Sequence, residues 1–270
     1  GLPLTVGDRF IVRDTGRQLV VGGGWVVDPA PGRSRRALQT VAGVEPAEEP
    51  DRVATRLLVG RRLDRLQRLS AHSGGGRPQG AVIIGDLAVE SGKMDELESV
   101  AVSLVEEEHS RHPLRPGLPM ATLAARLRIE AEIVEELVER AERLERRGPD
   151  VALAEHEPVL SEQQEAAWVK ARERLLPSLA VPGSDELGVD PDVLHLKIRT
   201  GELIRISDDL LYLPSQIEDL LSHMSELGED FTVAEFRDAA GLSRKYAVPI
   251  LEWADKEGLT FRRGDTRSLR

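Results

Sequence analysis

The stretch that decides the fold is residues 231–270, FTVAEFRDAAGLSRKYAVPILEWADKEGLTFRRGDTRSLR. Thr232 and Glu235 have the Thr-x-x-Glu spacing of a capping box, in which the two side chains satisfy free N–H groups at the start of a helix. Ser243 has the residue type of an N-cap and precedes a longer run of helix-forming residues. The stretch therefore predicts a short helix, a turn and a second, longer helix.

The residues after the second helix predict a β-hairpin. Gly258 marks the end of the helix, and residues 260–269 contain two short runs typical of strands. Gly264 and Asp265 lie between the runs and suit a two-residue hairpin turn. A helix-turn-helix followed by a β-hairpin is the outline of a winged helix, which is the fold that we expect here.

Basic side chains occupy positions in this module that are unfavourable in the free protein. Arg244 and Lys245 lie in the first turn of the second helix, where the helix dipole disfavours cations by roughly 0.3–1 kcal/mol each. Across a two-residue hairpin turn, Arg262 and Arg267 would face each other as a like-charge pair. A helix N-terminus also binds phosphate through its free N–H groups. The pattern favours a polyanion-binding module, and the alternative is an ordinary winged helix with solvated surface charges.

Residues 242–258, LSRKYAVPILEWADKEG, and the basic hairpin after them closely resemble the C-terminal module of the bacterial selenocysteine-specific elongation factor family, SelB. The resemblance implies a winged helix that grips an mRNA hairpin downstream of a UGA codon. A weaker resemblance covers the rest of the chain. Residues 7–29 carry GDR, RD, GGG and DP elements similar to the end of the third β-barrel of that family.

The resemblance and the unfavourable charges together indicate which residues would bind RNA. The two cations at the helix start would contact backbone phosphates, and the hairpin arginines would clamp the RNA with the wing. Tyr246, in the first turn of the helix, would stack on or position a loop base. The predicted RNA-binding residues are Arg244, Lys245, Tyr246, Arg262, Arg263 and Arg267.

Charge is distributed unevenly along the 270 residues, whose net charge is −11. Residues 230–270 hold eight Lys/Arg and seven Asp/Glu, a net charge of +1, which leaves 28 basic and 40 acidic residues, or −12, in the rest. An acidic surface repels nucleic acid. We therefore expect an elongated molecule with a single RNA-binding tip, instead of a uniformly basic one.

The N-terminal residues predict the end of a β-barrel. Three short apolar runs at residues 10–12, 19–21 and 25–27 read as strands, and strands of this number and length do not bury a core by themselves. The Gly-x-x-x-x-Gly-Lys-Ser/Thr signature of a phosphate-binding loop is absent from the sequence. We therefore expect no GTPase site and no other catalytic site in these residues.

The middle of the chain predicts winged helices in tandem. Gly148, Gly201 and Gly258 each close a predicted helix and precede hairpin-like residues, at a spacing suited to such units. The first of these helices is predicted over residues 131–147, with Leu144 on its apolar face. The expected fold is mainly α with small β-hairpins, arranged as an elongated array. The predicted domains are the barrel strands at 1–32, a linker with a degenerate winged helix at 33–92, a winged helix at 93–159, a shortened one at 160–214 and the RNA-binding one at 215–270.

The predicted repeats differ in charge where their last helix begins. The second repeat places Glu130 and Glu132 there, and the third places Asp190 and Asp192. Acids at a helix start suit the dipole and repel phosphate. We expect these two repeats to act as spacers or to contact protein.

Other expectations concern partners and location. We expect a piece of a longer protein, because the chain begins with Gly1 and not with Met. The resemblance implies that the intact factor binds GTP and Mg²⁺, the ribosome and selenocysteinyl-tRNA, whereas this piece needs no cofactor or metal. The absence of cysteine and of a long apolar run favours a cytoplasmic protein without a membrane span, expected to be a monomer. For the function, the alternatives to an RNA-binding part of an elongation factor are a DNA-binding regulator and a protein-interaction scaffold.

Overall fold

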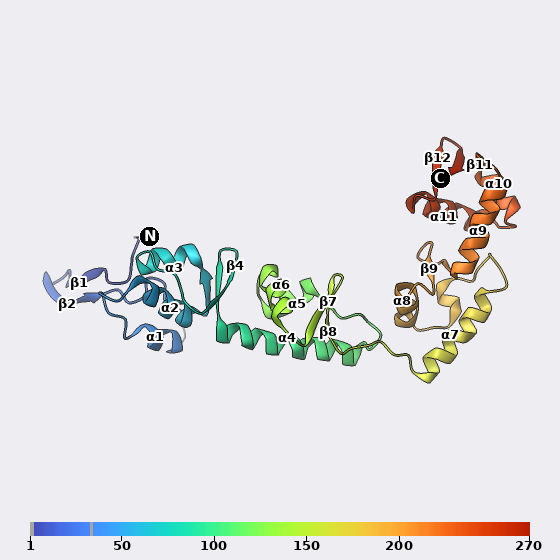
Figure 1. Ribbon diagram of the computed structural model, residues 1–270. Coiled ribbons are helices and arrows are strands. Elements are labelled where there is room, and N and C mark those ends of the chain that lie inside the picture. The colour runs from blue at the N-terminus through green and yellow to red at the C-terminus, as the bar shows by residue number, and fades with distance from the viewer. Residues whose placement is uncertain (1–2, 33–34) are drawn as a thin grey trace. The chain divides into compact units, whose positions relative to one another are not determined.

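The computed structural model describes residues 3–32 and 35–270 (Figure 1). Residues 1 and 33, where the first two predicted domains begin, lie outside the described residues. The described residues form eleven α-helices, one 3-10 helix and five small antiparallel sheets, as the sequence predicts. The chain divides into two compact units, one made of residues 1–108 and 116–156 and the other of residues 109–115 and 157–270.

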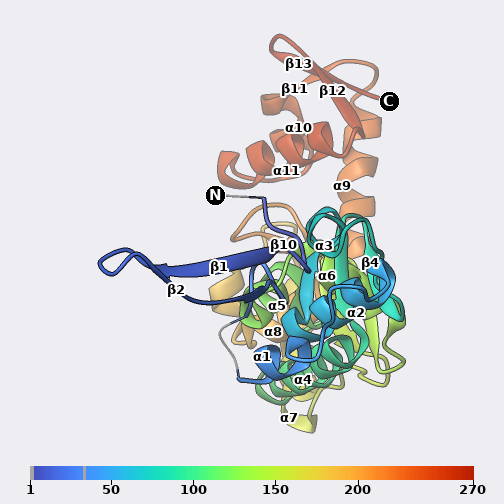
Figure 2. The same cartoon turned by 90° about the vertical axis from the view of Figure 1, so that its left-hand side faces the viewer.

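An antiparallel hairpin of β1 (Arg9–Asp14) and β2 (Leu19–Trp25) opens the first unit. The hairpin projects away from the helices that follow it (Figure 2). Its apolar side chains are largely exposed, with Ile11 at 70% and Val21 at 64%. The two strands therefore do not enclose a core by themselves. That they complete a barrel remains a prediction.

The next elements form a small winged helix with an incomplete set of helices. The three-stranded sheet has the order β3-β5-β4, and one helix, α3, lies between its first two strands in sequence. The elements are α1 (Arg35–Val41), α2 (Pro50–Arg61), β3 (Leu63–Arg65), α3 (Leu66–Ser73), β4 (Ala81–Ile84) and β5 (Leu87–Glu90).

A complete winged helix follows, which we call the second winged helix. Its sheet order is β6-β8-β7, and its core joins that of the preceding sheet through Val82, Leu87 and Val89. Its elements are α4 (Ser91–Arg111), β6 (Leu118–Pro119), α5 (Met120–Leu127), α6 (Ala131–Arg140), β7 (Leu144–Arg147) and β8 (Asp150–Leu153).

The role predicted for Gly148 is wrong. Helix α6 ends at Arg140, and Gly148 lies in the turn of the β7–β8 hairpin with φ +64°. Leu144 continues the apolar spacing of the helix, but it pairs with Leu153 as the first residue of a strand and is 4% exposed. A short apolar run suits either structure, and the pairing with β8 decides it.

The second unit begins with a shortened module. The one-turn 3-10 helix η1 stands where the second winged helix has α5. The elements are α7 (Glu162–Leu175), η1 (Ser184–Leu187), α8 (Pro191–Arg199), β9 (Ile204–Arg205) and β10 (Leu211–Tyr212).

The chain ends in the winged helix that the sequence predicts, which we call the terminal winged helix. Its sheet order is β11-β13-β12, and Phe231, Phe236 and Ile250 are buried in its core. Its elements are α9 (Pro214–Glu226), β11 (Phe231–Thr232), α10 (Val233–Ala239), α11 (Arg244–Lys256), β12 (Thr260–Arg263) and β13 (Thr266–Leu269).

Candidate nucleic-acid interface

The N-cap residue of α11 provides no side-chain hydrogen bond to the N–H groups of the first turn. Ser243 occupies the N-cap position with extended backbone, but its side chain accepts no hydrogen bond from the helix. Helix α10 differs, since Thr232 Oγ1 accepts from Glu235 N and Glu235 Oε2 accepts from Thr232 N at 2.7 Å. The first turn of α11 also lacks an acid. Its N–H groups and its dipole therefore favour a bound anion.

The side chains at this helix start are exposed cations beside a half-buried ring. Arg244 and Lys245 are exposed, and neither forms an ion pair within the described residues. Lys245 Nζ lies 5.4 Å from the centre of the Tyr246 ring, which packs partly against the core. The structure thus brings these three predicted residues together. The stacking role of Tyr246 remains a prediction.

A depression of about 290 Å³ joins the two helix starts to the wing turn. Thr232, Val233 and Ala234 line it from the start of α10. Arg244 lines it from α11, and Asp265 from the turn between β12 and β13. The helix-turn-helix and the wing therefore meet at one surface, where two helix dipoles begin.

The structure corrects the role predicted for Arg267. Arg262 and Arg267 are cross-strand partners, as the two-residue turn predicts. However, Arg267 is 5% exposed, and its Nε donates to Asp255 Oδ2 at 2.9 Å. The other oxygen of Asp255 accepts from Thr260 Oγ1 at 2.6 Å. Asp255 thus neutralises Arg267 inside the module, so this guanidinium holds α11 to the wing and is not presented to RNA.

The other two wing arginines are exposed. Arg262 Nε donates to the carbonyl of Gly264 at 2.9 Å, at the hairpin turn. The guanidinium of Arg263 lies 4.8 Å from the centre of the Phe261 ring. Within the part of the chain that the structure describes, neither arginine has a carboxylate partner. The sequence suggested that Phe261 fills the small core, whereas the side chain is 40% exposed. Its place two residues before Arg263, on the same face of a predicted strand, is the signal that could have found it.

The corresponding helix starts of the two preceding modules face basic residues of the same chain. Glu130, at the N-cap of α6, lies 3.6 Å from a guanidinium nitrogen of Arg65 on β3. Asp192, in the first turn of α8, lies 3.4 Å from Arg115 and 3.7 Å from His112. These helix starts carry acids that form contacts within the chain, and their predicted role as spacers or protein contacts remains a prediction.

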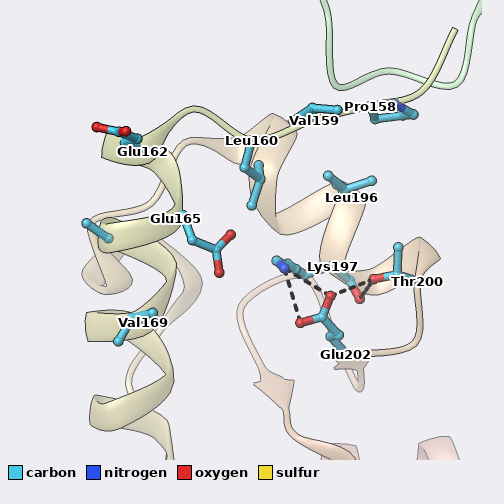
Figure 3. Close-up of a pocket in the computed structure, with 11 residues that line it drawn as sticks. Pro158, Val159, Leu160, Glu162, Glu165, Val169, Leu196, Lys197, Thr200 and Glu202 are labelled. Atoms are coloured by element: carbon cyan, nitrogen blue, oxygen red, sulfur yellow. Dashed lines mark hydrogen bonds and ion pairs between the residues drawn. The ribbon is translucent and has the colours of Figure 1, made fainter.

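A larger depression, of about 720 Å³, lies between α7 and α8 (Figure 3). Lys197 Nζ donates to both oxygens of Glu202 at 2.9 and 3.1 Å and lies 5.2 Å from the Trp168 ring centre. Burial raises the pKa of Glu202, but hydrogen bonds from Lys197 and Thr200 outweigh it, so the net pKa is lowered. Glu165 points into the depression (Figure 3). Lys197 is the only cation among the described residues that line the depression, and it is already paired, so the depression does not suit a polyanion.

Two further classes of site are absent from the described ranges, 3–32 and 35–270. No helix there is long and apolar enough to cross a membrane. No group of three or more His, Asp or Glu side chains there is arranged to hold a metal ion.

Comparison with known proteins shows which proteins this chain is similar to in sequence. Residues 222–269 match the winged-helix family described as elongation factor SelB, winged helix. A selenocysteine-specific elongation factor of Desulfomicrobium baculatum is 29% identical over 196 residues, which cover 66% of this chain and 31% of that protein. The selenocysteine-specific elongation factor of Escherichia coli (strain K12) is 33% identical over 128 residues, which cover 44% of this chain and 21% of that protein.

The fold of the chain also has a solved counterpart. The crystal structure of the bacterial selenocysteine-specific elongation factor EF-Sec aligns with a TM-score of 0.62 over 99% of this chain and 46% of that one, at 18% sequence identity. At that sequence identity the likeness shows a similar fold and nothing about function. This chain thus spans less than half the length of the proteins that it matches. It resembles the C-terminal part of SelB, and its last 49 residues contain the segment that matches the SelB winged helix.

Proposed function

We propose that this chain is the RNA-binding C-terminal region of a selenocysteine-specific translation elongation factor. In this proposal the terminal winged helix holds the mRNA hairpin that directs selenocysteine insertion at a UGA codon. The observation that carries it is the set of exposed cations without acidic partners at the start of α11 and on the wing. The set lies in the segment that matches the SelB winged helix, 222–269.

The phosphate backbone is the part of the RNA that this surface suits. Arg244 and Lys245 lie at a helix start whose N–H groups and dipole attract an anion, and Arg262 adds a cation from the wing. Such contacts fix the position of a nucleic acid on a protein without reading its sequence. Tyr246 is the proposed contact to a loop base, through the part of its ring that the core leaves exposed.

The preceding modules are proposed to connect this tip to the rest of the factor. In the whole protein, other parts would bind GTP with Mg²⁺, selenocysteinyl-tRNA and the ribosome in the cytoplasm. We propose that this part of the factor itself uses no cofactor or metal, in keeping with its lack of a phosphate-binding loop signature. We also propose that it acts as a monomer.

The proposal is tested by titrating the chain with a selenocysteine-insertion RNA hairpin and with duplex DNA of the same length, each over a range of salt concentrations. We expect tighter binding to the hairpin, with an affinity that falls as salt rises. Tighter binding to duplex DNA would favour a DNA-binding regulator. Absence of binding to either nucleic acid would favour a protein-interaction scaffold.

A further inference from the structure

Strand β12 presents an aromatic ring and a guanidinium together on the outer face of the wing. Residues alternate between the two faces of a strand, so Phe261 and Arg263 share one face while Thr260 and Arg262 share the other. Thr260 is 2% exposed and faces the core, whereas Phe261 is 40% exposed. The guanidinium carbon of Arg263 lies 4.8 Å from the centre of the Phe261 ring. The guanidinium thus lies over the ring, and we call this stacked pair of side chains the wing platform.

The neighbours of the wing platform leave it uncovered. The cross-strand partners of Phe261 and Arg263 are Ser268 and Thr266, whose side chains are short. On its other side β12 is the edge strand of the sheet, because the order is β11-β13-β12. The other two phenylalanines of this module, Phe231 and Phe236, are 1% and 0% exposed. Phe261 therefore contributes little to the core and stands on the surface with its cation.

We propose that the wing platform stacks on an unpaired base of the bound RNA. Bases that are not paired stack on aromatic rings and on the planes of arginine guanidinium groups, and a guanidinium also attracts the adjoining phosphate. The inference rests on the proposed function. It adds a base-contacting subsite on the wing to the basic residues Arg244, Lys245 and Arg262, which suit the phosphate backbone.

The test uses the full chain and two RNA probes. One is an RNA hairpin with 2-aminopurine at a loop position, whose fluorescence changes when the base stacks on protein. The other is the same stem closed as a blunt duplex. The variants are Phe261→Leu and Phe261→Trp, and circular dichroism checks that each is folded.

With the parent chain we expect the fluorescence of the hairpin to change on binding. Phe261→Leu should lose that change and bind the hairpin about tenfold more weakly, because base–aromatic stacking is lost, while its affinity for the duplex stays the same. Phe261→Trp should keep both the fluorescence change and the parent affinity for the hairpin. The subsite is refuted if Phe261→Leu gives the parent affinity and fluorescence change with every labelled loop position. Equal weakening for the duplex would also refute it, while failure of the parent chain to bind either RNA would overturn the proposed function itself.

Discussion

The second and the terminal winged helix have the same construction and opposite surfaces. Their sheets run in the equivalent orders β6-β8-β7 and β11-β13-β12. Even the wings match, since Arg146 Nε donates to the carbonyl of Gly148 and Arg262 Nε to that of Gly264, both at 2.9 Å. The difference lies where the last helix begins, with Glu130 facing Arg65 in one module and with exposed cations in the other. A few side chains on a shared fold thus separate a structural contact from a candidate binding surface.

The two helix starts also differ in what they contribute to stability. Glu132 in the first turn of α6 suits the helix dipole, and Glu130 precedes it at the N-cap. Arg244 and Lys245 oppose the dipole of α11, and Ser243 provides no side-chain cap. The terminal module therefore retains an arrangement that is unfavourable in the free protein, which a bound phosphate would relieve.

The largest expected effect is a reversal of charge at the start of α11. Replacing Arg244 and Lys245 with Glu should weaken binding of the RNA hairpin by at least about a hundredfold, because like charges brought together cost several kcal/mol. The measurement is a binding titration at fixed salt. The matched control in the second winged helix is Arg126→Glu with Arg128→Glu, which changes net charge equally and should leave the affinity nearly unchanged. Equal loss in both double variants would point to a general effect of net charge.

The next largest effect is on the free energy of unfolding, and it distinguishes the buried arginine of the wing, Arg267, from the exposed ones. Arg267→Ala should lower the free energy of unfolding of the terminal winged helix by about 2 kcal/mol, since it leaves Asp255 without its cation. Arg263→Ala is the control, and as a surface change it should stay within about 0.5 kcal/mol. Urea denaturation measures both, followed by the fluorescence of Trp253 in a chain whose Trp25 and Trp168 are replaced by Phe. A stable Arg267→Ala protein would mean that its contact with Asp255 is of little importance.

Much of the terminal module could be predicted from sequence, because its signals are local. The Thr-x-x-Glu spacing predicted a capping box of Thr232 and Glu235, and the structure contains it. Gly264 was predicted at the hairpin turn, and the structure places it there. The function of Arg267 could not be predicted in this way. Its partner, Asp255, lies 12 residues away on another element, and only the folded module brings the two charges together.

The other features that the sequence did not predict have a related cause. Leu144 continued the apolar spacing of α6, although the structure pairs it with Leu153 in a strand. Ser243 was correctly placed at an N-cap, but sequence does not tell whether such a side chain forms its hydrogen bond. Phe261 was not assigned a site because an aromatic residue in a small module usually fills its core.

A smaller effect concerns the contact that covers the start of α6. Glu130→Ala should destabilise the packing of the second winged helix on its predecessor by about 0.2–1 kcal/mol, because its ion pair with Arg65 is half-exposed. Hydrogen exchange in α6 measures the change. RNA affinity should not change, and an increase in it would show that Glu130 had been masking a phosphate site.

The smallest effect is a difference in acid sensitivity. The backbone and side-chain hydrogen bonds of Thr232 hold the pKa of Glu235 below its ordinary value of 4.5. Because the pKa of Glu235 is lower in the folded protein than in the unfolded chain, its ionised carboxylate stabilises the fold at a pH above the unfolded pKa. That stabilisation is lost as the pH falls through the pKa of the folded protein. Amide exchange at the start of α10 should therefore accelerate as the pH falls below about 4.5 relative to the intrinsic rate. Glu235→Gln should remove this dependence, and α5, which has no side-chain cap, should not show it.

The salt dependence of RNA binding tests the contrast between the two wings most directly. The slope of log affinity against log salt should become shallower by about one unit in Arg262→Ala, because one phosphate contact is lost. Arg146→Ala removes the equivalent wing arginine of the second winged helix and should leave the slope unchanged. Equal slopes for Arg262→Ala and the parent chain, or a shallower slope for Arg146→Ala alone, would contradict the assignment of the RNA to the terminal winged helix.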